Sequence, residues 1–209
     1  KIDRKILYYL DLNARMSNFK IAKKMKTSRE VVDYRIKRLL REGIINRFFT
    51  HIQSQKVGFT IYKLYFKLKG LSEAKEKELV NFFVDHKNVY RVTTCDGIYD
   101  LIVSITAKDV YQLNAMLQEC YHKYGFYFLT KDVTISIAIY HCRRGYIIGK
   151  EKNDMPPLFK GGEKGSIVLD EKDTEILKIL ANNARMPVIE IARRLGITSS
   201  AVIYRIKQL

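Results

Sequence analysis

The chain contains an internal repeat. Residues 3–39 align without a gap with residues 173–209, at an offset of 170 residues, and 16 of the 37 positions are identical. The identities include Asn-Ala-Arg-Met at residues 13–16 and 183–186, and Tyr-Arg-Ile-Lys at residues 34–37 and 204–207. A gapless match of this density predicts that both stretches fold into the same small module.

Apolar residues recur at helical spacing in each copy and predict three short helices. In the second copy we expect Asp173 to cap the first helix, Pro187 to begin the second and Thr198 to cap the third. Gly196 suits the tight turn before the third helix, where the first copy carries Lys26 and the turn should be strained. Two helices joined by a short turn are typical of a helix-turn-helix.

The third helix of such a module enters the major groove of DNA, and side chains near its N-terminus reach the base edges. A surrounding ring of cations would hold phosphates without reading sequence. This ring consists of Arg15, Lys23, Lys24 and Arg38 in the first copy and Arg185, Arg193 and Arg194 in the second. The DNA-binding candidates are Ser28, Arg29, Asp33, Tyr34, Lys37 and Arg38, and in the second copy Thr198, Ser199, Ser200, Tyr204 and Lys207.

Two acidic residues, Glu30 and Asp33, also lie on the expected reading face of the first copy. A carboxylate can accept a hydrogen bond from cytosine, but two carboxylates repel phosphates. Two alternatives therefore stay open: the first copy has kept the fold and weakened its grip on DNA, or both faces are merely solvated.

The net charge of +16 is unevenly distributed. Residues 1–57 hold 15 Lys and Arg against 5 Asp and Glu, whereas residues 58–142 hold 10 against 9. Residues 143–209 hold 13 against 8. Basic ends around a nearly neutral middle favour nucleic-acid-binding modules that flank another domain, although charge would also suit an anionic membrane surface.

The middle of the chain alternates apolar and polar residues. Strands are predicted at 44–53, 59–69, 89–95, 99–106 and 133–142, and helices after Ser72 and over 109–124. The order β-α-β-β-α-β describes a ferredoxin-like domain. The predicted fold class is α+β: a winged-type three-helix helix-turn-helix with a β connection (1–57), a ferredoxin-like domain (58–142), a linker (143–168) and a second, truncated helix-turn-helix (169–209).

Several classes of protein and site are not expected. No apolar run is long enough to span a membrane, and no signal peptide opens the chain. Cys95, Cys120 and Cys142 are widely spaced, which argues against disulfides and zinc and favours the cytoplasm. We expect no metal, no cofactor and no catalytic residue. The chain starts without methionine and stops inside a helical pattern, so both ends look truncated.

The Asn-Ala-Arg and Arg-Ile-Lys-x-Leu signatures, followed by residues 41–45 (Arg-Glu-Gly-Ile-Ile) and a β-α-β-β-α-β domain, resemble the Lrp/AsnC family of feast/famine regulators in bacteria and archaea. The resemblance implies a sequence-specific DNA-binding transcription regulator. It also implies a dimer or higher oligomer assembled through the ferredoxin-like (RAM) domain.

The same resemblance implies a small effector, usually an amino acid, near a G-x-x-D turn, here Gly97 to Asp100. Backbone amides at this turn could hold a carboxylate, and an acidic side chain an amino group. An ordinary hairpin turn is the alternative. The effector-site candidates are Thr94, Asp96, Gly97, Ile98, Tyr99 and Asp100.

The duplication departs from the family pattern of one helix-turn-helix and one sandwich. It is similar to tandem archaeal members, so we expect the full protein to continue into a second sandwich. Two other functions remain open. Siroheme decarboxylases share both domains and act on an anionic tetrapyrrole, and a scaffold could have lost DNA binding.

Overall fold

A computed structural model describes the 209 residues except 143, 150–157, 162–164 and 166. The chain divides into two compact units. One comprises Lys1–Ile52, Tyr140–Leu158 and Leu169–Leu209, and the other comprises Gln53–Ile139 and Phe159–Val168. Both copies of the repeat therefore belong to the first unit, and the predicted ferredoxin-like domain makes up most of the second.

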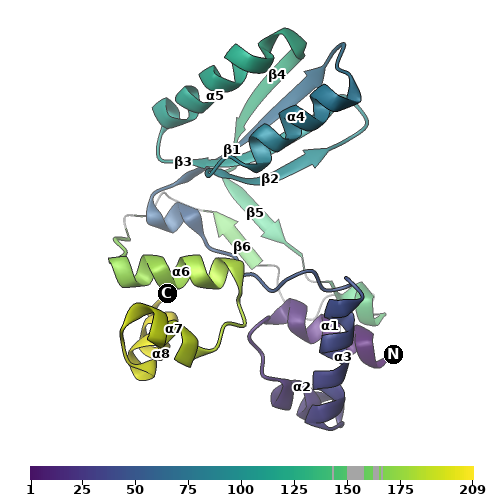
Figure 1. Cartoon of the computed structure of the whole chain (residues 1–209), viewed down its shortest axis with the longest axis vertical. Coiled ribbons are helices and arrows are strands. Elements are labelled where there is room, and N and C mark those ends of the chain that lie inside the picture. The colour runs from purple at the N-terminus through teal and green to yellow at the C-terminus, as the bar shows by residue number, and fades with distance from the viewer. Residues whose placement is uncertain (143, 150–157, 162–164, 166) are drawn as a thin grey trace. The chain divides into compact units, whose positions relative to one another are not determined.

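The first copy folds into three helices, α1 (Ile2–Leu12), α2 (Asn18–Met25) and α3 (Arg29–Arg41) (Figure 1). The side chain of Ser17 caps α2 and that of Ser28 caps α3, each by accepting a backbone N–H three residues later. Such caps satisfy N–H groups that have no partner within the helix. The helices close on a buried apolar cluster of Ile6, Leu10, Ile21, Ala22, Val32, Ile36, Leu39 and Ile45.

The second copy repeats this arrangement with α6 (Glu171–Asn182), α7 (Val188–Leu195) and α8 (Ser199–Gln208). Thr198 caps α8 as predicted, since its hydroxyl accepts the N–H of Ala201. The cap of α6 is Asp170 and not Asp173, because Asp170 Oδ1 accepts the N–H of Asp173 at 2.7 Å. The prediction for Asp173 was wrong because the helix begins at Glu171, two residues before the repeat does.

Residues 44–53, predicted as a strand, contain no regular strand. Their backbone instead bonds the second copy. The N–H of Thr50 donates to the carbonyl oxygen of Leu180 at 3.2 Å, and the carbonyl oxygen of Phe48 accepts from the N–H of Ala184 at 2.9 Å. Leu180 lies in the last turn of α6, where carbonyl oxygens have no helical partner. A helix end thus replaces the neighbouring strand that the alternating pattern suggested.

The second unit contains the β-α-β-β-α-β order that the sequence predicted. Its elements are β1 (Thr60–Leu68), α4 (Glu73–Val84), β2 (Val89–Thr94), β3 (Leu101–Ala107), α5 (Val110–Tyr124) and β4 (Phe128–Ile135). The 3-10 helices η1 (Ser54–Val57) and η2 (Gly125–Tyr127) precede β1 and β4. The strands form an antiparallel sheet in the order β2-β3-β1-β4.

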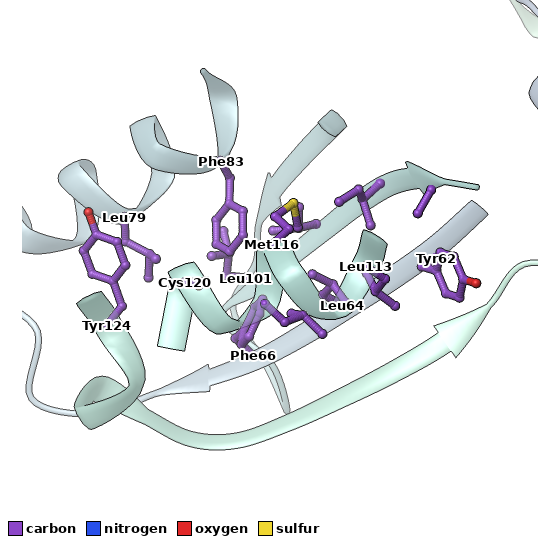
Figure 2. Close-up of a cluster of buried hydrophobic side chains, with 14 residues drawn as sticks. Tyr62, Leu64, Phe66, Leu79, Phe83, Leu101, Leu113, Met116, Cys120 and Tyr124 are labelled. Atoms are coloured by element: carbon purple, nitrogen blue, oxygen red, sulfur yellow. The ribbon is translucent and has the colours of Figure 1, made fainter. Parts of the chain in front are cut away.

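Two helices bury one face of this sheet. Leu64 and Phe66 of β1 and Leu101 of β3 pack against Leu79 and Phe83 of α4 (Figure 2). Helix α5 contributes Leu113, Met116, Leu117 and Cys120 to the same cluster. Asp109 caps α5 and Ser72 caps α4. The alternation that predicted β1 is therefore the pattern of a strand with one buried face.

The last predicted strand, residues 133–142, is interrupted. The segment Phe128–Ile135 pairs with β1 as strand β4. The last hydrogen bond of this pairing runs from the N–H of Ser136 to the carbonyl oxygen of Ile61. A separate strand, β5 (Ala138–His141), pairs with β6 (Leu158–Gly161). Isoleucine recurs at every second residue across the break, so periodicity could not reveal it. The predicted linker, residues 143–168, lies partly outside the described residues; its described part includes η3 (Gly145–Ile148) and β6.

The turn before the third helix tests the strain predicted for Lys26. Lys26 has φ 53°, and among the described residues it is the one non-glycine residue with positive φ. Its counterpart Gly196 has φ 62° and open space where a Cβ would lie. The left-handed conformation costs a residue with a Cβ about 1–2 kcal/mol.

We therefore predict that Lys26→Gly stabilises the first module by roughly 0.5–1 kcal/mol, after allowance for the entropy that glycine adds to the unfolded chain. Gly196→Ala should destabilise the second module by about 1 kcal/mol for the same reason. Local stability can be measured by amide hydrogen exchange in α2 and α7. Lys24→Gly, at an exposed helical position, serves as the control and should destabilise. Equal effects of Lys26→Gly and Lys24→Gly would contradict the prediction.

Candidate nucleic-acid interface

The candidate DNA-reading side chains lie along α3 and α8 and begin at the capping residues Ser28 and Thr198. Tyr34 and Tyr204 occupy equivalent positions and are exposed to nearly the same degree, 64% and 65%. The other fully exposed candidates are Ser28, Arg29, Lys37, Thr198, Ser199, Ser200 and Lys207. The fold thus brings Ser28, Arg29, Thr198, Ser199 and Ser200 to the N-terminus of each third helix, the part that reads base edges in helix-turn-helix proteins. Lys37 and Lys207 lie in the C-terminal half of these helices.

Two predicted site residues are half-buried and already have protein partners. The carboxylate of Asp33 accepts a hydrogen bond from the amide of Asn18 and lies 3.5 Å from Arg29 Nε. Arg38 Nη2 donates to Asp3 at 2.6 Å, and Arg38 Nε lies 3.5 Å from Glu42. Asn18 was not predicted; an asparagine on an amphipathic helix gave no signal that it would hold a carboxylate.

The described lysines and arginines around the reading faces differ in whether they already pair with an acidic side chain. Lys23, Lys24 and Lys37 are exposed. Arg193 and Arg194 both contact Glu190, at 2.8 and 3.1 Å, but these are surface pairs within one helix. Exposed ion pairs contribute at most about 1 kcal/mol, so a phosphate can compete for these arginines.

An ion pair joins the first and third helices in both modules. Arg35 Nη1 donates to Asp3 at 3.0 Å, and Arg205 Nη1 donates to Asp173 at 2.7 Å. Burial alone would raise the pKa of Asp3, but the hydrogen bonds and charges of Arg35 and Arg38 outweigh it and lower the pKa. The repeated aspartate and arginine therefore fix the orientation of each reading helix.

The candidate effector turn connects β2 to β3. Thr94, Asp96, Gly97 and Ile98 are exposed, whereas Tyr99 and Asp100 are half-buried. The hydroxyl of Tyr99 donates to Asp132 Oδ2 at 2.6 Å. The turn is thus held by its two half-buried side chains and leaves its other four candidates open to solvent.

Asp100 fastens this turn to β1. Its Oδ2 accepts the N–H of Leu68 and its Oδ1 the ammonium of Lys67, both at 2.7 Å. The backbone hydrogen bond from Leu68, followed by that from Lys67, lowers the pKa of Asp100. Lys67 also donates to the carbonyl oxygen of Gly97 at 2.9 Å. Lys67 was missed because the sequence showed only that it alternates with buried residues.

Other potential sites in the described part of the chain are sparse. A depression of about 260 Å³ lies at the opposite end of β3, with His86, Thr106, Gln112 and Glu119 among its lining residues. None of these was singled out in the sequence. The described residues contain no cluster of three or more potential metal ligands, and none of their helices has the length and apolar character of a membrane span.

Family models match both copies of the repeat. A model of the AsnC-type helix-turn-helix domain matches residues 169–209, and a winged helix-turn-helix DNA-binding model matches residues 1–46. The HTH-type transcriptional regulator Ptr1 of Methanocaldococcus jannaschii is 32% identical over 122 residues, which cover 57% of this chain and 79% of that protein.

Solved structures share the fold. Escherichia coli AsnC matches with a TM-score of 0.53 at 19% identity, over 65% of this chain and 90% of its own. A transcriptional regulator from Neisseria meningitidis, solved as a complex with L-Met, matches with a TM-score of 0.56 at 17% identity, over 65% of this chain and 88% of its own. These likenesses support the α+β fold of the chain.

The lowered pKa of Asp100 predicts a pH dependence of stability. A carboxyl with a lower pKa in the folded than in the unfolded state stabilises the fold above its unfolded pKa of about 3.9, and this contribution is lost as pH falls through the folded pKa. Asp100→Asn should therefore lower the free energy of unfolding at pH 7 by about 1 kcal/mol and have less effect at pH 3.

Urea denaturation followed by tyrosine fluorescence at both pH values would measure this. Asp96→Asn, at the exposed side of the same turn, should change neither value. An equal loss for Asp100→Asn at both pH values would show that the charge of Asp100 is not what holds the turn.

Proposed function

Since the chain belongs to the Lrp/AsnC family of helix-turn-helix transcriptional regulators, we propose that it binds specific DNA sequences and that a small effector modulates this binding. The observation that carries the proposal is the pair of exposed, polar reading faces on α3 and α8, on capped helices within the basic parts of the chain. Base contacts would come from the exposed side chains, and phosphate contacts from lysines and arginines around them.

Asp33 and Arg38 have a different part in this proposal. Because both side chains already bond neighbouring side chains, they position α3 and do not make the primary contacts with DNA. Glu30 is then the one acidic side chain of the first reading face that is fully exposed. A single carboxylate on this face is compatible with cytosine recognition.

For the effector we propose an amino acid, bound at the turn between β2 and β3. Asp100 already pairs with Lys67, so Asp96 is the carboxylate available for an amino group. Ile98, 83% exposed, offers apolar contact to a side chain. A relative solved with L-Met makes methionine the first amino acid to test.

Self-association through the ferredoxin-like domain is part of the same proposal. The edge strand β4 exposes Leu129, Val133 and Ile135, and an exposed apolar edge is a common place for a second copy to dock. We place the activity in the cytoplasm, because Cys95, Cys120 and Cys142 are free thiols. Sedimentation velocity of the whole protein would measure its assembly.

Siroheme decarboxylation is the alternative function. It would require side chains that act on tetrapyrrole carboxylates, and the cations of this chain gather instead on the helix-turn-helix modules. Incubation with siroheme distinguishes the two, because decarboxylation would produce a spectral change and a regulator would not.

DNA binding is tested first by selection of duplexes from random DNA and then by substitution. Arg29→Ala with Lys37→Ala in the first module, and Lys207→Ala in the second, should each weaken binding to the selected duplex. Loss of one base contact costs about 1–3 kcal/mol, and loss of one phosphate contact lowers the slope of log K against log salt by about 1.

Lys77→Ala is the control, because it removes an exposed charge on α4, in the unit that contains the ferredoxin-like domain. Fluorescence anisotropy over a range of salt concentrations measures both the affinity and its salt slope. If affinity and salt slope survive all three reading-helix changes, α3 and α8 do not bind DNA.

The effector site makes a separate prediction. Asp96→Asn should weaken L-methionine binding at least about tenfold, since a hydrogen bond to a charged group contributes about 1.5–3 kcal/mol. Isothermal titration measures this. Asp85→Asn, an exposed aspartate at the end of α4, should bind as the wild type does. Retained affinity in Asp96→Asn would place the amino acid elsewhere.

A further inference from the structure

The two helix-turn-helix modules of the chain exchange equivalent hydrogen bonds. Arg15 Nη1 donates to the carbonyl oxygens of Ala184 and Met186, at 2.6 and 3.2 Å. Arg185 Nη1 donates to the carbonyl oxygens of residues 14 and 16, at 3.0 and 3.2 Å. Each arginine thus bonds the two residues that flank the other.

This reciprocity has the pattern of a two-fold axis. In an interface between identical surfaces, residue i contacts residue j and j contacts i. Here Arg15 and Arg185 are equivalent across the 170-residue offset, and so are the carbonyls that they reach. Burial lowers the pKa of both guanidinium groups, as expected of side chains withdrawn from solvent. The modules therefore pair as the halves of a homodimer do, but within one chain.

The identical Asn-Ala-Arg-Met segments build the turns that aim these arginines. Asn13 Oδ1 accepts the N–H of Arg15 at 2.9 Å, and Asn183 Oδ1 accepts the N–H of Arg185 at 3.0 Å. In each turn the methionine N–H also donates back to the asparagine carbonyl. One of the two tetrapeptides that repeat without change in the sequence is thus a contact element between modules.

Further contacts extend the pairing along the segment after α3. Besides the backbone bonds from Phe48 and Thr50 to the second module, the guanidinium of Arg185 lies 5.2 Å from the Phe48 ring centre. A cation in this position is attracted to the aromatic face. The contact is therefore not confined to one pair of side chains.

One arm of the contact reaches a reading helix. Arg185 Nη2 donates to Asn18 Oδ1 at 2.6 Å, and the amide of Asn18 donates to Asp33 on α3. The second module has Val188 and Ile203 at the positions of Asn18 and Asp33, so it has no such link. The acid on the first reading face is thereby tied to an arginine of the other module.

We propose that the two modules form one pre-paired DNA-binding unit, held by the reciprocal Arg15 and Arg185 contacts, and that a single chain binds a duplex with two unlike half-sites at fixed spacing. This rests on the proposed DNA-binding function. A two-fold pair matches the dyad of a duplex, on which half-sites recur at about one helical turn or multiples of it. The reading faces differ, because the first has Arg29 and Glu30 where the second has Ser199 and Ser200. The half-sites that they read should therefore differ as well.

Pairing is tested first without DNA. The N–H groups of Thr50 and Ala184 donate between modules, so hydrogen exchange at these amides reports the contact. In the whole chain, Arg15→Ala/Arg185→Ala should speed exchange there about tenfold or more, while the amides inside α2 and α7 keep their rates. Arg15→Lys/Arg185→Lys, which retains charge but not the forked donor geometry, should have the same direction of effect.

Arg4→Ala/Lys178→Ala removes one exposed charge from each module and serves as the control. It should leave exchange unchanged. The pairing is overturned if Thr50 and Ala184 exchange at unprotected rates in the wild type, or if both arginine variants exchange as the wild type does.

Spacing is tested with a duplex selected from random DNA. Inserting five base pairs between the two protected segments turns one half-site to the opposite side of the helix. Wild-type affinity should fall about a hundredfold, because the second module can no longer bind together with the first. In Arg15→Lys/Arg185→Lys the insertion should have little effect.

The outcomes distinguish failure of the paired modules from failure of DNA binding itself. Wild-type affinity that is insensitive to the insertion, or an increase in affinity in the arginine variants, overturns the fixed-spacing unit while DNA binding stands. If no duplex is bound and the amides remain protected, DNA binding fails and the pairing of modules stands.

Discussion

Each reading helix is held by an ion pair that both modules share, between an aspartate in the first helix and an arginine in the third. The apolar clusters of these modules are small; in the second, five residues are buried. An apolar cluster is not directional and fixes helix orientation poorly. The Asp3–Arg35 and Asp173–Arg205 hydrogen bonds are directional, and they add a specific orientation to helices whose inward face is already set by their apolar stripe.

The repeat in the sequence records two different constraints. Val32, Ile36 and their counterparts are needed to close each module. The arginine of Asn-Ala-Arg-Met is not needed for that purpose, because it bonds the other module, whereas the methionine of the same segment packs on its own module's core. An arginine kept in both copies, yet directed away from both cores, is understandable if each copy serves as the docking surface of the other.

Local signals in the sequence were sufficient where the structure is local. The helix start at Ser72, the cap at Thr198, the strained turn at Lys26 and the alternation in β1 all depend on neighbours within a few residues. The predictions that were wrong depended on distant partners. Residues 44–53 have the pattern of a strand, but they bond a helix end that lies 130 residues later. The assignment of Asp173 as a cap failed because the α6 helix starts before the repeat begins.

The site residues show the same division in terms of charge. Sequence places cations near the reading faces but does not show which acid or carbonyl each one reaches. Arg15 and Arg185, grouped by charge with the phosphate-binding ring, donate to carbonyl oxygens of the other module. Arg38 is held by Asp3, and Asp100 is held by Lys67. Charge density therefore identified the right region, while the role of each arginine required the tertiary structure.

Asp33 shows how a residue that is unfavourable in one module can be accommodated in the paired modules. Considered as one module, a carboxylate on a DNA-reading face is unfavourable because phosphates repel it. In the paired unit it lies at the end of a path from Arg185 through Asn18, where a positive charge offsets it. The second module has Ile203 at the position of Asp33 and Val188 at that of Asn18, so neither group of this path is present there. The asymmetry between the copies then follows the one part of their contact that is not reciprocal: both arginines reach carbonyl oxygens of the other module, but Arg185 also donates to the side chain of Asn18.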